Sequence, residues 1–178
     1  MSLRGHCILS HGFESGPDAT KVTALAEVAQ RLGWSHERPD YTAFDAKLAL
    51  GRHGDVAARL AHLQALASAR AAEGPVVLAG SSLGAWVSGA VSLQLPVRAL
   101  FLMAPPVNLA TEHPLQAAPV PTAIIHGWRD ELIPATDVVA WAAPRGDRLL
   151  LVDDGHRLSG HVEASAALFA DLLGSLAP

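Results

Sequence analysis

Short apolar runs separated by longer segments of helical periodicity restrict the fold of this sequence more than any other feature. Residues 76–79 (VVLA) and 99–103 (ALFLM) are apolar at every position, as expected of strands that are covered on both faces. Residues 35–39 are polar, which favours the edge of a sheet. Alternating strands and helices are typical of a parallel sheet with crossover helices. The predicted strands are residues 5–10, 35–39, 75–80, 97–103, 120–126 and 147–152.

The segments between these runs have apolar residues three or four positions apart, which predicts amphipathic helices that cover the sheet. We expect Asp18 or Thr20 to cap the first helix and Asp55 to cap the second, with Gly33 and Gly74 near their ends. The apolar positions are Val22, Leu25, Ala29 and Leu32, then Val56, Leu60, Leu63 and Ala67, and finally Val162, Ala166, Phe169 and Leu173 in a closing helix at about 160–176.

The composition agrees with one compact domain that covers residues 1–178, because half of the residues are apolar and only 17% are charged. A net charge of −4 provides no basic field, so we expect neither nucleic acid nor a membrane surface as a partner. The one cysteine, Cys7, excludes an internal disulfide. The apolar stretch Cys7–Ser10 is too short for a signal peptide or a membrane span, which favours a cytoplasmic location.

The sharpest chemical signal is the sequence GSSLG at residues 80–84, directly between a predicted strand and an apolar helix. A nucleophile elbow places a serine on a tight, strained strand-to-helix turn, with a glycine two residues away on either side. Only Ser82 has glycine at both positions, Gly80 and Gly84, so it is predicted to be the nucleophile rather than Ser81. The alternative is a Gly/Ser turn without a catalytic role.

A second signal follows the first predicted strand, in the sequence SHGFESGP at residues 10–17. Glycine in such a loop allows a backbone amide to point at a developing oxyanion. We predict that the backbone N–H groups of Phe13 and Leu83 form the oxyanion hole, with His11 and Gly12 completing the motif. The alternative is an ordinary turn between a strand and a helix.

The candidate acid, Asp130, follows the predicted strand 120–126 and the loop residue Gly127. The carboxyl ends of strands in an open α/β sheet form the edge at which ligands bind, so Asp130 can face the site. Its neighbour Glu131 could take the same part. Asp130 could instead be a helix cap or turn residue.

The candidate base, His156, follows the last predicted strand and Gly155. An imidazole can take the serine proton and return it to the leaving group near neutral pH. His161 is close in sequence, but we expect it in the closing helix. Ser82, Asp130 and His156 occur in the chain order expected for an elbow serine, an acid and a base at successive strand ends.

These motifs resemble those of the α/β-hydrolase superfamily, in particular its small esterase-like members with an HGF oxyanion loop, a GSSLG elbow, an HGxxD acid loop and a GH base. The resemblance extends from His11 to His156. It implies the α/β-hydrolase fold, with a mostly parallel sheet of about six strands and helices on both faces. It also implies a serine hydrolase without a cofactor that cleaves small carboxylic esters or thioesters through an acyl-enzyme.

Two departures from the superfamily pattern affect the expected site. Only one strand fits before His11, so the sheet is trimmed. Residues 104–119 are too few for a large helical lid, although residues 41–54 are long enough for a small flap. The pocket is therefore expected to be shallow and open, which favours short acyl groups.

Several side chains have two interpretations. Trp86, Trp128 and Met103 are candidate pocket walls or ordinary core residues. Cys7 lies within a predicted strand and is interpreted as a buried structural residue rather than a nucleophile.

Neither metal-ligand spacing nor a phosphate-binding loop is present in the sequence. An acyltransferase or peptidase would use the same residues, and a binding module could keep the fold without turnover. The sequence carries no signal for oligomeric state.

Overall fold

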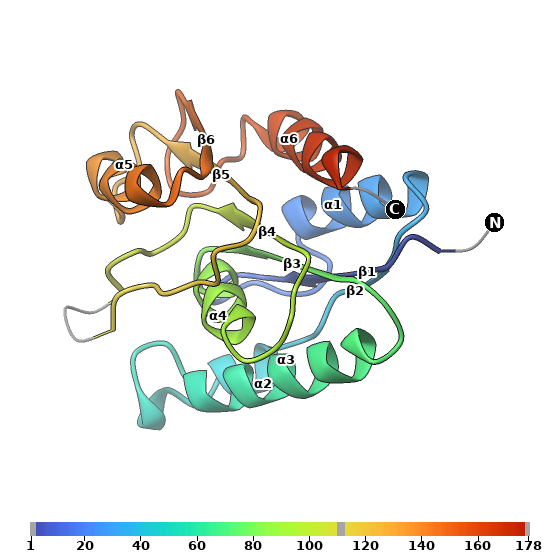
Figure 1. Ribbon diagram of the computed structural model, residues 1–178. Helices are drawn as coiled ribbons and strands as arrows, with labels where there is room; N and C mark the ends of the chain where they lie inside the picture. The colour runs from blue at the N-terminus through green and yellow to red at the C-terminus, as the bar shows by residue number, and fades with distance from the viewer. Residues whose placement is uncertain (1–2, 110–112, 177–178) are drawn as a thin grey trace.

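The computed structural model describes residues 3–109 and 113–176 (Figure 1). Within them, six strands form a single sheet in the order β2-β1-β3-β4-β5-β6, and every neighbouring pair is parallel. The prediction of a trimmed parallel sheet of about six strands is confirmed. The weak strand predicted at 35–39 does lie at an edge. The strands are β1 (His6–Ser10), β2 (Ser35–Glu37), β3 (Val76–Ser81), β4 (Ala99–Met103), β5 (Thr122–Gly127) and β6 (Arg148–Val152).

Helices connect most of these strands and cover both faces of the sheet. In the described part of the chain, no helix is both long and apolar enough to cross a membrane. The α-helices are α1 (Thr20–Arg31), α2 (Thr42–Asp45), α3 (Val56–Ala71), α4 (Leu83–Ser92), α5 (Ala135–Ala142) and α6 (Val162–Ser175), and the 3-10 turns are η1 (Leu48–Leu50) and η2 (Ala143–Arg145).

Two apolar cores lie on opposite faces of the sheet. Helices α1 and α6 lie side by side on one face (Figure 1). In this core the rings of Phe101 and Phe169 pack at a tilt of 52°, with their centroids 5.0 Å apart. Helices α3, α4 and α5 form the other core with Leu63, Val87 and Val138. The central strands β3 and β4 are buried at every position, which explains why they lack alternation in sequence.

The helix caps agree only in part with the sequence pattern. The carboxylate of Asp55 accepts a hydrogen bond from the backbone N–H of Ala58 at 2.9 Å, so the predicted cap of α3 is confirmed. The cap predicted for α1 is wrong, because Ala19 occupies that position and no side chain caps it. Thr20 is already the first helical residue, and Asp18 lies 3.6 Å from Arg38.

The buried faces of α3 and α6 are also rotated from the predicted ones. In α3 the residues facing the core are Arg59, Leu63 and Ala67, whereas Leu60 is only partly buried. In α6 the fully buried residues are Ser165, Leu168, Phe169, Leu172 and Leu173. The burial of Arg59 is unexpected for a charged side chain, and its surroundings are described below.

Candidate active site

The turn between β3 and α4 has the geometry of a strained elbow. Ser82 has φ +52° and ψ −119°, a left-handed conformation that non-glycine residues rarely adopt. A Cβ atom on Gly80 would lie 2.2 Å from the backbone of Gly84, and one on Gly84 would lie 2.2 Å from the carbonyl oxygen of Ser10. Both neighbours must therefore be glycine for the turn to close over β1.

Ser82 is hydrogen-bonded to a distant histidine, which is in turn hydrogen-bonded to a distant carboxylate. Its Oγ lies 2.8 Å from Nε2 of His156, and Nδ1 of the same imidazole lies 2.7 Å from Oδ2 of Asp130. The Asp130 side chain is fully buried, whereas the His156 side chain is 13% exposed. If Asp130 is ionised, Nδ1 of His156 donates to it, and Nε2 can accept the hydroxyl proton of Ser82. The structure thus brings together the three residues singled out in the sequence.

The carboxylate of Asp130 is held in place by the backbone of its own loop. Its Oδ1 accepts hydrogen bonds from the N–H groups of Leu132 at 2.9 Å and Ile133 at 2.8 Å. Burial acts to raise the pKa of Asp130, but the hydrogen bonds from His156, Ile133 and Leu132 outweigh it and leave that pKa below its usual value. Asp130 therefore stays ionised near neutral pH.

Glu131 does not replace Asp130 at the imidazole. Its Oε2 instead accepts a hydrogen bond from the backbone N–H of His156 at 3.1 Å. The pKa of Glu131 is lowered mainly by a hydrogen bond from its own backbone N–H, and the contact with His156 adds to this effect. Asp130 and Glu131 thus hold the side chain and the backbone of His156 respectively.

The loop that presents His156 is closed by Asp154, a residue that the sequence analysis did not single out. Oδ1 of Asp154 accepts from the N–H of Gly155 at 2.8 Å, and Oδ2 accepts from the N–H of Gly160 at 3.0 Å. Oδ2 also lies 2.9 Å from Nδ1 of His161, which immediately precedes α6 rather than lying within it. Asp154 thereby links both ends of the loop around His156.

Lys21 of α1 supports the same loop from a second side. Its Nζ donates to the carbonyl oxygen of Arg157 at 2.7 Å. Burial lowers the pKa of Lys21 to about 8, although the carboxylates of Asp154 and Asp130 act in the opposite direction. No local pattern in the sequence relates this residue to a loop 136 positions away.

The loop after β1 lies against the elbow. A Cβ atom on Gly12 would stand 3.5 Å from that of Ser82, so the two backbones approach closely. No acceptor for the backbone N–H of Phe13 is found among residues 3–109 and 113–176. Leu83 is the first residue of α4, and the N–H of such a residue has no acceptor within its own helix. These two backbone N–H groups thus have no acceptor in the described part of the chain.

The candidate pocket residues differ in their surroundings. Met103 is fully buried in the core beneath α1 and α6, so its side chain forms no wall of a pocket open to solvent. Trp86 packs at the margin of the opposite core. Trp128 is 57% exposed beside the acid loop, where Leu132 is 66% exposed. Apolar surface is therefore present near Asp130.

The segment predicted as a flap, residues 41–54, divides into two parts. Tyr41 and Asp45 are buried beside the loop after β1, so this part is fixed in the fold. Leu48 and Leu50 are 58% and 66% exposed. Arg52 reaches across to the carbonyl oxygen of Leu109 at 3.0 Å.

The other two candidate nucleophiles, Cys7 and Ser81, are buried residues of strands. Cys7 is buried within β1, and burial raises the pKa of its thiol, as expected for a structural cysteine. Ser81 is a buried residue of β3. Among the described residues, no three His, Cys, Asp or Glu side chains gather as ligands for a metal ion.

A parallel sheet with a strained serine elbow at the carboxyl end of a central strand, and an imidazole and carboxylate from later strand ends, defines the α/β-hydrolase class. The chain superposes with a TM-score of 0.96 on the crystal structure of an inferred hydrolase of the alpha/beta superfamily from Xanthomonas campestris pv. campestris. The two are 64% identical, over 97% of this chain and 100% of that one. The chain therefore belongs to the α/β-hydrolase superfamily.

More distant structures share the fold. An alpha-beta serine hydrolase homologue from Coxiella burnetii is 22% identical, with a TM-score of 0.71 over 97% of this chain and 86% of that one. The esterase Pf2001 from Pyrococcus furiosus is 14% identical, with a TM-score of 0.74 over 98% of this chain and 84% of that one. Neither a protein-family model nor a curated protein sequence gives a significant match.

Proposed function

We propose that this protein is a serine hydrolase that cleaves small carboxylic esters or thioesters through an acyl-enzyme intermediate. The observation that supports it most is the unbroken hydrogen-bonded chain from Oγ of Ser82 through the imidazole of His156 to Oδ2 of Asp130, with distances of 2.8 and 2.7 Å. A hydroxyl that hydrogen-bonds a base, itself oriented by a buried carboxylate, is the arrangement needed to activate a serine.

The proposed reaction has two half-reactions. Oγ of Ser82 attacks the substrate carbonyl as Nε2 of His156 takes its proton, and the same proton then goes to the leaving alcohol or thiol. Water next attacks the acyl-serine, with His156 again as base, and releases the acid. Asp130 holds the imidazole tautomer and stabilises the imidazolium in both steps.

Negative charge on the tetrahedral intermediate requires donors that are in place beforehand. The N–H groups of Phe13 and Leu83 are the proposed donors, because each lacks another acceptor in the described part of the chain. Leu83 directly follows Ser82, and Phe13 follows Gly12, where an added Cβ would lie 3.5 Å from that of Ser82. The small carboxylic ester or thioester class rests on the short connection after β4, which leaves little room for a lid. The Pyrococcus structure is named an esterase and the Coxiella structure a serine hydrolase homologue, although their low identity supports the fold alone.

Activity-based labelling tests the proposal directly. A fluorophosphonate probe should modify wild-type protein at Ser82, as mapped by mass spectrometry, and Ser82→Ala should abolish both labelling and hydrolysis of p-nitrophenyl acetate. Ser81→Ala is the matched control and should keep both. A Ser82→Ala variant that hydrolyses the ester at the wild-type rate would show that the nucleophile is wrong.

The same experiment separates the alternatives. A catalytically silent binding module with this fold would not be labelled at Ser82. An acyltransferase or peptidase would be labelled, but would turn over faster with an added amine or alcohol acceptor, or with amide substrates. A panel of acyl lengths completes the test, since a strong preference for long chains would contradict a shallow pocket.

A further inference from the structure

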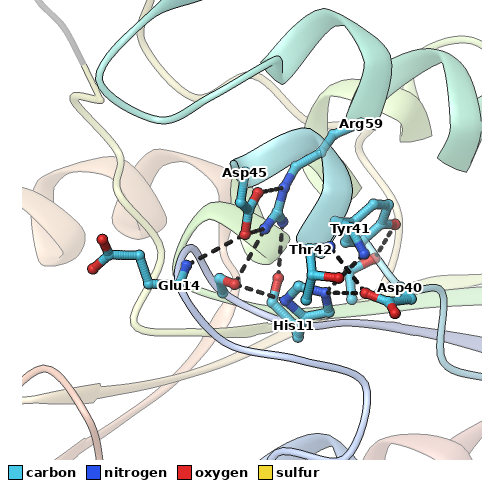
Figure 2. Close-up of polar contacts among 9 residues, drawn as sticks. His11, Glu14, Asp40, Tyr41, Thr42, Asp45 and Arg59 are labelled. Carbon is cyan, nitrogen blue, oxygen red and sulfur yellow. Dashed lines mark hydrogen bonds and ion pairs between the residues drawn. The ribbon is translucent and has the colours of Figure 1, made fainter. Parts of the chain in front are cut away.

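The loop at residues 11–14 is tied to a buried ion pair that lies outside the proposed catalytic residues (Figure 2). Arg59 of α3 is fully buried, and its guanidinium binds both carboxylate oxygens of Asp45, at 2.7 and 2.6 Å. The same guanidinium donates to two successive carbonyl oxygens, that of His11 at 3.0 Å and that of Gly12 at 3.1 Å. One side chain thus binds the loop at two points.

Asp45 binds the loop at a third point. Its Oδ2 accepts a hydrogen bond from the backbone N–H of Glu14 at 3.3 Å (Figure 2). Glu14 has φ +56°, so its backbone lies in the left-handed region that is unfavourable for a residue with a side chain. The Arg59–Asp45 pair therefore holds the backbone on both sides of Phe13, whose N–H is left open.

The position of one carbonyl decides where that N–H points. The peptide bonds of the described chain are trans, and in a trans peptide the C=O and N–H groups point in opposite directions. The carbonyl oxygen of Gly12 faces Arg59 and also lies 2.7 Å from Nδ1 of His11. The N–H of Phe13, in the same peptide unit, therefore points away from Arg59.

A second set of contacts locks the imidazole that shares this carbonyl. The N–H of Tyr41 donates to Nε2 of His11 at 2.9 Å, so Nδ1 is the protonated nitrogen and donates to Gly12. Burial lowers the pKa of His11, which keeps this neutral tautomer near pH 7. The Arg59 guanidinium lies over the ring of Tyr41, 4.5 Å from its centroid.

We propose that Arg59 and Asp45 are positioning residues that hold the oxyanion loop in its binding form before substrate arrives. The inference rests on the proposed function, which assigns the N–H of Phe13 to the oxyanion hole. A buried ion pair is a poor source of stability, since desolvation offsets most of its attraction. The other hydrogen bonds of this ion pair go to the backbone of residues 11–14, which fits a role in holding that loop in position.

A matched control exists at the opposite edge of the sheet. Arg145 pairs with Asp147 at 2.6 Å, donates to the carbonyl oxygens of Ala117 and Ala118, and lies over the ring of Trp141 at 4.5 Å. It therefore makes the same kinds of contact as Arg59, away from Ser82, although its side chain is 19% exposed where that of Arg59 is fully buried. Arg145→Lys should cost similar contacts without disturbing the loop at residues 11–14.

The test compares Arg59→Lys and Asp45→Asn with Arg145→Lys, all in the full chain. In the first two, kcat for p-nitrophenyl acetate should fall about 10- to 100-fold, since a misplaced oxyanion donor acts in the transition state, while KM stays within about threefold. Amide hydrogen exchange at residues 11–14 should become faster in these two variants. Arg145→Lys should change neither quantity. If Arg59→Lys fails to fold, the kcat and hydrogen exchange of the isosteric Asp45→Asn variant test the inference.

The two readouts separate failure of this inference from failure of the proposed function. Unchanged kcat and unchanged exchange at residues 11–14 in folded Arg59→Lys and Asp45→Asn would overturn the positioning role. An equal loss of kcat in Arg145→Lys, at a matched loss of unfolding midpoint, would overturn it too. Faster exchange together with a wild-type protein that hydrolyses no ester would refute the hydrolase and leave the loop-holding role of Arg59 supported.

Discussion

A Cβ atom on Gly84 would lie 2.2 Å from the carbonyl oxygen of Ser10, because the first turn of α4 packs directly on the end of β1. This approach brings the elbow and the loop after β1 side by side. The atoms that an added Cβ would meet belong to the backbone, so no flexible side chain can move away. Gly84→Ala should therefore lower the free energy of unfolding by about 3 kcal/mol or more. Urea denaturation of the purified variant measures the loss.

Gly174→Ala is the matched control for this substitution. Gly174 lies within α6, where nothing is found within 4 Å of an added Cβ atom. Alanine loses less conformational entropy than glycine on entering a helix, so this variant should gain about 0.5–1 kcal/mol. Equal stability of the two variants would mean that β1 and α4 are not as closely packed as described.

Asp130→Asn should lower kcat by about 10³- to 10⁴-fold while the fold is retained. The amide cannot act as a charged acceptor for Nδ1 of His156, so the imidazole loses both its tautomer and the stabilisation of its protonated form. Ester hydrolysis under saturating substrate measures the effect.

The neighbouring Glu131→Gln variant serves as the comparison. Because Glu131 contacts the backbone N–H of His156 and not its imidazole, the loss of this carboxylate should reduce kcat far less than Asp130→Asn does. A larger loss in Glu131→Gln would assign the orienting role to the wrong carboxylate.

Much of the fold and the three site residues could be predicted from the sequence because their signals are local. The strands β3 and β4 are apolar because both of their faces are buried. The glycines around Ser82 are needed because the backbone nearby leaves no room for a Cβ atom. Each of Ser82, Asp130 and His156 also follows its own strand. The parallel sheet then brings these strand ends to one edge without further information.

The supporting contacts could not be predicted in the same way. Helical periodicity assigns a charged residue to the solvent face, yet Arg59 is buried because its partners are Asp45 and two carbonyl groups more than 45 positions away. Met103 was a candidate wall because it ends a strand near the site. Whether such a side chain faces a pocket or the core depends on the pleat and the covering helices, which only the structure provides.

Asp154→Ala should weaken both the fold and the proposed activity. The side chain is 16% exposed and accepts hydrogen bonds from Gly155, Gly160 and His161. Their loss should lower the free energy of unfolding by about 1–3 kcal/mol. A looser loop should also misplace His156 and reduce kcat about 10-fold.

The adjacent Asp153→Ala is the control. It removes a carboxylate whose side chain is 81% exposed, so its effect on stability should stay within about 0.5 kcal/mol. Matching losses in the two variants would remove the special role of Asp154.

Buried imidazoles should make the protein less stable as the pH falls below about 6.5. Burial is the main cause that lowers the pKa of His6, His11, His53 and His126 from 6.5 in the folded state. Just below pH 6.5 the unfolded chain therefore binds protons that the folded chain does not. The free energy of unfolding then decreases as the pH falls, until the pH lies below the pKa values of the folded state. Carboxylates such as Asp130, with a lowered pKa, add to the loss only at lower pH, below their unfolded value of 3.8. Urea midpoints between about pH 7.5 and 5 measure the slope.

His126 provides the variant for this prediction. It is fully buried, its Nε2 donates to the carbonyl oxygen of Ile133 at 2.9 Å, and its Nδ1 has no partner among the described residues. His126→Gln should make the fall in stability between pH 6.5 and 5 shallower, because one group no longer gains a proton on unfolding. The exposed His113→Gln is the control and should leave the slope as it is. A His126→Gln slope equal to that of the wild type would show that the imidazole of His126 takes up its proton as readily in the folded chain as in the unfolded one.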